Sequence, residues 1–143
     1  MWEFECSEET TASPADVWAL WSDPVRWSEF DPGIVWARLE GPFVAGAKVK
    51  LKPKGGPSSS LEIVTAEPER GFSTLAKLPL AQLHFAHEVS DAGDGKRRLT
   101  SKIQVTGALS WLFPRLFRLS GNEVVMLGKL ARLAEKPPPG DAP

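Results

Sequence analysis

The sequence has few of the residues on which specific chemistry is usually built. It has no tyrosine, one cysteine (Cys6) and two histidines (His84 and His87). One cysteine forms no intrachain disulfide, and with two histidines it is too few for an ordinary zinc site, so we expect no metal and no cofactor. The 17 Lys and Arg residues nearly balance the 18 Asp and Glu residues, which predicts no nucleic-acid partner.

Long hydrophobic runs are also absent. No run approaches the roughly 20 apolar residues of a membrane span, and the start, MWEFECSEET, is too acidic for a signal peptide. We therefore expect a cytoplasmic protein without stable membrane insertion, of unknown oligomeric state. The length of 143 residues suits one domain, which we assign to residues 1–135, and the proline-rich residues 136–143 are expected to form a disordered tail.

Large aromatic side chains are concentrated near the start of the chain. Residues 13–32, SPADVWALWSDPVRWSEFDP, hold three tryptophans, one phenylalanine and three prolines. A serine followed by a proline predicts a helix start, and Asp23-Pro24 predicts that this helix ends and a second short helix begins. We expect the first helix to plug the core, and Trp27 and Phe30 to border the mouth of a cavity.

The rest of the chain alternates with the period of a strand and then changes to the period of a helix. Strand patterns end at turn signals rich in glycine and proline, which indicates antiparallel hairpins. A helical pattern follows from about residue 110 to 135, with Pro114 and Gly121 as expected points of interruption. The predicted strands are residues 2–10, 33–39, 47–53, 60–67, 72–78, 82–90 and 97–105.

The turn at residues 93–95 fixes the register of one hairpin. Pairing residues whose numbers sum to 188 brings every large apolar residue on one face opposite another. The resulting pairs are Val89 with Leu99, Phe85 with Ile103, and Leu83 with Val105. The same register places His87 opposite Ser101 on this inward face, while His84 has the opposite parity and is expected to face solvent.

His87 has three interpretations. The commonest for a lone inward histidine is a structural residue, here hydrogen-bonded to Ser101. The second is a polar anchor that orients a ligand in an apolar pocket. The third is a general base, which makes His87 the one candidate catalytic residue.

Several of these segments together resemble the START/Bet v 1-like superfamily (SRPBCC), in its polyketide cyclase/dehydrase and lipid transport branch. The similar stretches are SPADVWALWSDPVRWSEFDPGI, EGPFVAGAKVKL, IVTAEPERGF and SDAGDGKRRLTSKIQVTG, together with the terminal Leu-Ala-Glu. The resemblance implies an α+β helix-grip fold. In this fold a seven-stranded antiparallel sheet wraps around a long C-terminal helix, and two short helices lie between the first two strands.

The resemblance implies a binding or carrier protein for a small hydrophobic molecule, such as a lipid, an isoprenoid or a polyketide-like compound. No catalytic set is shared across the superfamily, and the tyrosine that some cyclases use is missing here. The expected ligand-binding residues are Trp27, Phe30, Leu83, Phe85, His87, Ser101, Ile103, Leu112, Leu116, Val124 and Leu127.

Two other functions stay open. One is a cyclase or dehydratase that uses His87 as general acid and base. The other is a protein-interaction module, which would use the aromatic excess in LSWLFPRLFRLSG, residues 109–121. Trp111 and Phe113 in this stretch cannot share one helix face with the leucines, so we expect them at a portal, at a membrane or partner contact, or in the core.

Overall fold

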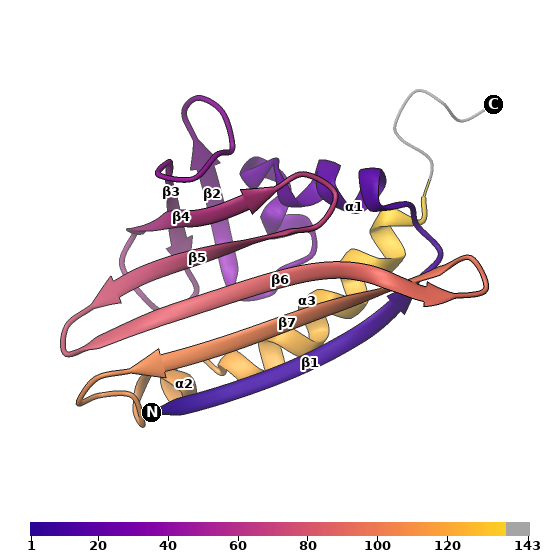
Figure 1. Cartoon of the computed structure of the whole chain (residues 1–143). Helices are drawn as coiled ribbons and strands as arrows, with labels where there is room; N and C mark the ends of the chain where they lie inside the picture. The colour runs from indigo at the N-terminus through magenta and orange to yellow at the C-terminus, as the bar shows by residue number, and fades with distance from the viewer. Residues whose placement is uncertain (137–143) are drawn as a thin grey trace.

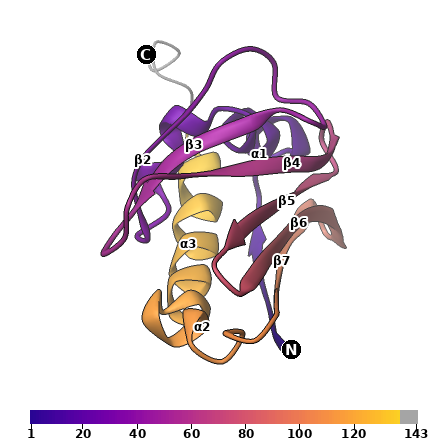
Figure 2. The ribbon, with the colours of Figure 1, turned by 90° about the vertical axis from the view of Figure 1, so that its left-hand side faces the viewer.

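A single curled antiparallel sheet surrounds one long helix. The computed structural model describes residues 1–136, so most of the predicted tail lies outside the described residues. The strand order is β1-β7-β6-β5-β4-β3-β2, and every neighbouring pair is antiparallel. The longest helix, α3, lies along the concave face of this sheet (Figures 1 and 2). The α+β helix-grip prediction is confirmed.

The strands follow the alternation in the sequence, and their bounds lie within a few residues of the predicted ones. Inward and outward positions alternate along β1 and β7, as expected for strands with one covered face. The seven strands are β1 Trp2–Thr10, β2 Ile34–Leu39, β3 Lys48–Pro53, β4 Ser59–Glu67, β5 Gly71–Leu78, β6 Ala81–Gly93 and β7 Lys96–Thr106.

Two short helices connect β1 to β2, as predicted. Helix α1 spans Pro14–Trp21, and the Ser13 hydroxyl caps it by accepting from the Asp16 amide at 3.1 Å. The second helix, η1, spans Pro24–Glu29 and is a 3-10 helix. Its tighter winding suits a segment of only six residues, which begins at Pro24 and is followed by Pro32.

The C-terminal helical region is two helices and not one. Helix α2 spans Phe113–Leu116 and α3 spans Leu119–Ala134, so the expected helix over 110–135 is divided. The break lies at Arg118, whose backbone is left-handed with φ 51°. Pro114 lies in the first turn of α2, where proline is tolerated, and Gly121 lies in the first turn of α3, so neither causes the break.

The β6–β7 hairpin has the predicted register. His87 pairs with Ser101, and the three apolar pairs and Asp91 with Arg97 are also as expected. A shift by one residue would turn the apolar set to the outer face, which explains why the pattern specifies this register so strongly.

The interior holds two groups of packed side chains. The larger lies between α1, η1, the sheet and α3, and the smaller lies near the start of β6 and the end of β7. The C-terminal end of α3 is held against β1, because the Thr10 hydroxyl donates to the Ala131 carbonyl at 3.0 Å. No helix within residues 1–136 is long and apolar enough to cross a membrane.

Candidate ligand-binding cavity

A cavity of about 560 Å³ lies between the concave face of the sheet and the helices. Its wall includes residues from η1 and the turn after it, from strands β2 to β6, and from both C-terminal helices. Extrapolating roughly 24 cal/mol per Å³, a dry void of this size would cost about 13 kcal/mol, which rivals the whole stability of a domain. The space is therefore open to solvent or filled by a ligand.

Six of the residues expected at the ligand site line this cavity. Trp27 and Phe30 are buried in its wall, so they lie deeper than the mouth position expected for them. The other four come from β6 and from α2. They are Leu83, Phe85, His87 and Leu116.

The other five expected residues are not in the cavity wall. Val124 is wrong as an inward residue, because it is 53% exposed on the outer side of α3. Leu127 is buried in the larger core group and Ile103 in the smaller one, where each contacts protein instead of the cavity. Leu112 precedes α2 and Ser101 is fully buried in β7, and neither reaches the cavity wall.

His87 contacts the long helix and not its cross-strand neighbour. Its Nε2 atom lies 3.2 Å from Oε1 of Glu123 on α3, and both side chains are nearly buried. The expected hydrogen bond to Ser101 is therefore wrong. Within the described residues, His87 Nδ1 and Ser101 Oγ are both buried without a partner.

Asp31 adds a second carboxyl group to this part of the wall. It follows η1, and its Oδ1 accepts from the Gly33 amide at 2.8 Å. The pKa of Asp31 is raised to about 7, mainly by burial and also by the charge of Glu123, while the Gly33 hydrogen bond and His87 oppose the shift. Asp31, His87 and Glu123 form the polar pole of the cavity.

An aromatic wall surrounds the polar pole. The His87 ring stacks on Phe72 with centroids 4.7 Å apart, and Trp21 lies 6.1 Å from His87. Trp27 stacks on the same phenylalanine at 6.1 Å and donates from Nε1 to the Trp21 carbonyl at 3.0 Å. The aromatic stretch in the sequence thus both packs the core and lines the cavity.

The sequence-based expectation missed both carboxylates of the polar pole. Neither Asp31 nor Glu123 is among the residues expected at the ligand site. One signal for Glu123 was available. Glu123 lies four residues before Leu127 and seven before Leu130, and both leucines are fully buried. This spacing places Glu123 on the same, covered face of its helix.

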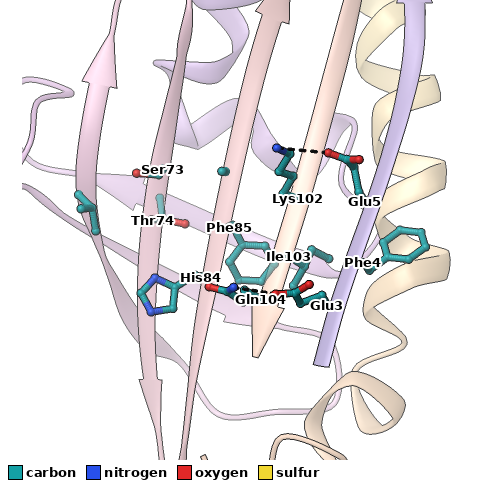
Figure 3. Close-up of a pocket in the computed structure, with 12 residues that line it drawn as sticks. Glu3, Phe4, Glu5, Ser73, Thr74, His84, Phe85, Lys102, Ile103 and Gln104 are labelled. Atoms are coloured by element: carbon teal, nitrogen blue, oxygen red, sulfur yellow. Dashed lines mark hydrogen bonds and ion pairs between the residues drawn. The ribbon is translucent and has the colours of Figure 1, made fainter. Parts of the chain in front are cut away.

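A second hollow, of about 670 Å³, lies on the outer face of the same strands (Figure 3). Two pairs of its polar side chains interact with one another. Gln104 donates to Glu3 at 2.9 Å, and Lys102 Nζ lies 3.4 Å from Glu5 Oε1. His84 lines this outer hollow, as its parity predicted.

Cys6 lies on the inner face of β1, opposite Ser101 in register. The pKa of its thiol is raised to about 11, mainly by burial and also by the charges of Glu123 and Glu5. The thiol therefore stays protonated near neutral pH and behaves as a small, half-buried packing residue. Residues 1–136 contain no group of His, Cys, Asp and Glu arranged to hold a metal ion.

A curled sheet that closes on a long helix around a mostly apolar cavity defines a helix-grip protein of the Bet v 1 type, with a general role in binding ligands. The family model for polyketide cyclase / dehydrase and lipid transport matches residues 1–135. The chain belongs to this family. Among curated proteins, none matches the sequence.

Solved structures agree on the fold at low sequence identity. Norcoclaurine synthase from Thalictrum flavum is 13% identical, with a TM-score of 0.72 over 95% of this chain and 87% of that chain. A Thermobifida fusca protein is 18% identical, with a TM-score of 0.71 over 94% and 93%. Ara h 8.0201 is 12% identical, with a TM-score of 0.68 over 93% and 97%. Another structure of the synthase holds dopamine and hydroxybenzaldehyde.

Proposed function

We propose that the protein binds or carries a small, mostly apolar molecule with one polar group, such as a lipid, an isoprenoid or a polyketide-like compound. The observation that carries the proposal is a 560 Å³ cavity with apolar walls and a polar pole on one side. Ligand sites of roughly 300–1,000 Å³ have this composition, with a few polar groups that orient the ligand. The volume favours a small-molecule site over a pure protein-interaction module.

The polar pole restricts the chemistry of the ligand. Asp31 and Glu123 would repel an anionic group at this pole, although Lys54 and Arg118 also line the cavity. A hydroxyl or carbonyl group near His87 gains a hydrogen bond without the cost of burying a second charge. The molecule is therefore expected to carry its polar group at the end that reaches this pole.

The first experiment identifies what the cavity holds. Native mass spectrometry of the purified protein, followed by analysis of its organic extract, measures the mass of any bound compound. The expected result is an apolar compound with one hydroxyl or carbonyl group. A compound that is strongly anionic would contradict the proposed chemistry of the pole.

The second experiment tests whether the cavity is the site. Ala76 of β5 lines the cavity, whereas Ala86 of β6 lines the outer hollow. An apolar fluorescent dye is titrated into the wild type, Ala76→Trp and Ala86→Trp. We expect Ala76→Trp to weaken dye binding at least tenfold by filling the cavity, and Ala86→Trp to leave it unchanged. Equal binding by all three proteins would refute the cavity as the site.

A second candidate function is general acid–base catalysis, of the cyclase or dehydratase kind. The observation that favours it is Glu123, whose carboxylate lies 3.2 Å from His87 Nε2 inside the cavity. A catalytic histidine needs such a partner to fix its ring and its tautomer. Asp31, with its pKa raised to about 7, would supply a second proton-exchanging group near neutral pH.

The compound recovered from a His87 variant separates the two functions. A carrier yields the same compound from the wild type and from His87→Ala. A dehydratase yields a compound from His87→Ala that is heavier by one water than the compound from the wild type, because the substrate is no longer converted. Glu123→Gln is the matched variant, since it keeps the size of the side chain and removes its charge.

A further inference from the structure

One end of the molecule combines basic residues with exposed apolar side chains. At this end β3 turns into β4, β5 turns into β6, and β7 leads into α2. We call it the mouth end and define it as residues 52–59, 77–81 and 107–118. The Leu109 amide donates to the Leu80 carbonyl at 3.0 Å, and a Cβ atom on Gly56 would lie 3.2 Å from the Phe117 ring. The three segments are therefore in contact.

Charge is distributed unevenly between the two ends of the sheet. Residues 41–61, 71–87 and 95–122 contain no Asp or Glu, although the whole chain has 18. The mouth end carries Lys52, Lys54, Lys77, Arg115 and Arg118, and none of them forms an ion pair within residues 1–136. Asp31 lies inside the cavity, and Gln104 of β7 donates to Glu3 on the outer face of β1.

The opposite end of the sheet carries both signs of charge. The end of β1, the β4–β5 turn and the β6–β7 turn hold the acids Glu8, Glu9, Glu67, Glu69, Asp91 and Asp94 and the bases Arg70, Lys96, Arg97 and Arg98. Asp91 pairs with Arg97, and Glu9 with Arg98. A negatively charged surface would therefore attract the mouth end more than the other end.

Three large apolar side chains project from the basic end. Leu80 is 69% exposed, and Trp111 and Leu116 are each 61% exposed. Leu80 belongs to the β5–β6 turn, and Trp111 and Leu116 belong to the adjacent segment that follows β7. In the sequence, Arg115 stands between Trp111 and Leu116, and Arg118 follows Leu116. A tryptophan and leucines beside unpaired arginines are suited to the boundary between lipid headgroups and acyl chains.

We propose that the mouth end docks on an anionic lipid bilayer. The five basic residues contact the headgroups, and Leu80, Trp111 and Leu116 enter the interfacial layer. Leu116, Phe117 and Arg118 also line the cavity, so docking brings the cavity wall at the α2–α3 joint against the bilayer. The attachment is peripheral. It goes beyond the proposed function, because vesicle binding requires no ligand in the cavity.

Sedimentation with lipid vesicles tests the docking. The probes are vesicles of phosphatidylcholine alone and of equimolar phosphatidylcholine and phosphatidylglycerol, at low and at physiological salt. We expect the wild-type protein to sediment with the anionic vesicles, and less so as salt rises. One basic residue near an anionic surface contributes about 1 kcal/mol, so Arg115→Glu should weaken partitioning about tenfold. Trp111→Ser should also weaken it.

The control reverses a charge at the other end. Lys96→Glu, in the β6–β7 turn, should leave partitioning unchanged. Absence of binding to anionic vesicles at low salt would overturn the proposal, and so would an equal loss in Lys96→Glu and Arg115→Glu. If Trp111→Ser binds like the wild type, the contact is electrostatic only, and the proposed entry of the apolar side chains into the bilayer is wrong. Dye titration without vesicles reports separately on the cavity, so either proposal can fail alone.

Discussion

The two histidines of β6 lie three residues apart and experience opposite environments. His84 lines the outer hollow, among exposed charged and polar side chains. His87 lines the inner cavity, stacked on Phe72 and within hydrogen-bond distance of a buried glutamate. Strand alternation separates their faces, but only the long helix makes the two faces chemically different, because it covers one of them and brings Glu123 to it.

The largest expected difference between the faces is in packing. Phe72→Ala on the inner face should lower the free energy of unfolding by about 3–5 kcal/mol, since its ring contacts Trp21, Trp27, Phe43 and His87. Val64→Ala in the outer hollow should cost less than about 1 kcal/mol. Denaturant unfolding at neutral pH measures both. Equal costs would show that the inner face is not the packed one.

The pH dependence of stability should come from the inner face. The raised pKa of Asp31, about 7 against 3.8, means that the folded protein keeps a proton that the unfolded chain has lost between these values. Stability should therefore fall as pH rises from about 4 to about 7, by up to about 4 kcal/mol, and by less where solvent in the cavity screens the carboxylate. Unfolding of Asp31→Asn across this range should show a flatter profile. An unchanged profile would exclude Asp31 as the cause.

The two histidines should also differ in their effect on ligand affinity, by less than the stability differences above. His87→Ala should weaken binding of a hydroxyl- or carbonyl-bearing dye by about 1 kcal/mol and barely affect a pure hydrocarbon probe. His84→Ala should change neither. Fluorescence titration of both variants with both probes makes the comparison. A loss in His84→Ala that matches the loss in His87→Ala would contradict an inner site.

The smallest effect is expected for the ion pair of the outer hollow. Lys102 and Glu5 are both exposed, so a double-mutant cycle should give a coupling of about 0.2–1 kcal/mol that decreases with salt. The same cycle on His87 and Glu123 should give a larger coupling that salt hardly changes, since both side chains are buried. Similar salt dependence for the two pairs would remove the distinction between the faces.

Most of the fold could be predicted because its signals are local. Alternation located all seven strands, the serine cap and prolines located α1 and η1, and apolar matching set the β6–β7 register. The break at Arg118 was missed because a left-handed arginine has no local signature. The Asn122 side chain, which donates to the Phe117 carbonyl at 2.9 Å, stabilises the break from the next helix.

Only part of the candidate site could be predicted: the strand residues could be, and the residues of α3 and of the turn after η1 could not. Leu83, Phe85 and His87 follow from strand parity and were placed correctly on the concave face. Val124 was misplaced because the rotation of α3 about its axis depends on which side the sheet covers. The sequence by itself determined the elements, their order and the face of each strand, since these depend on neighbours along the chain. Only the tertiary structure decided that Asp31, His87 and Glu123 share one cavity wall, because burial and long-range contacts bring together residues up to 92 positions apart.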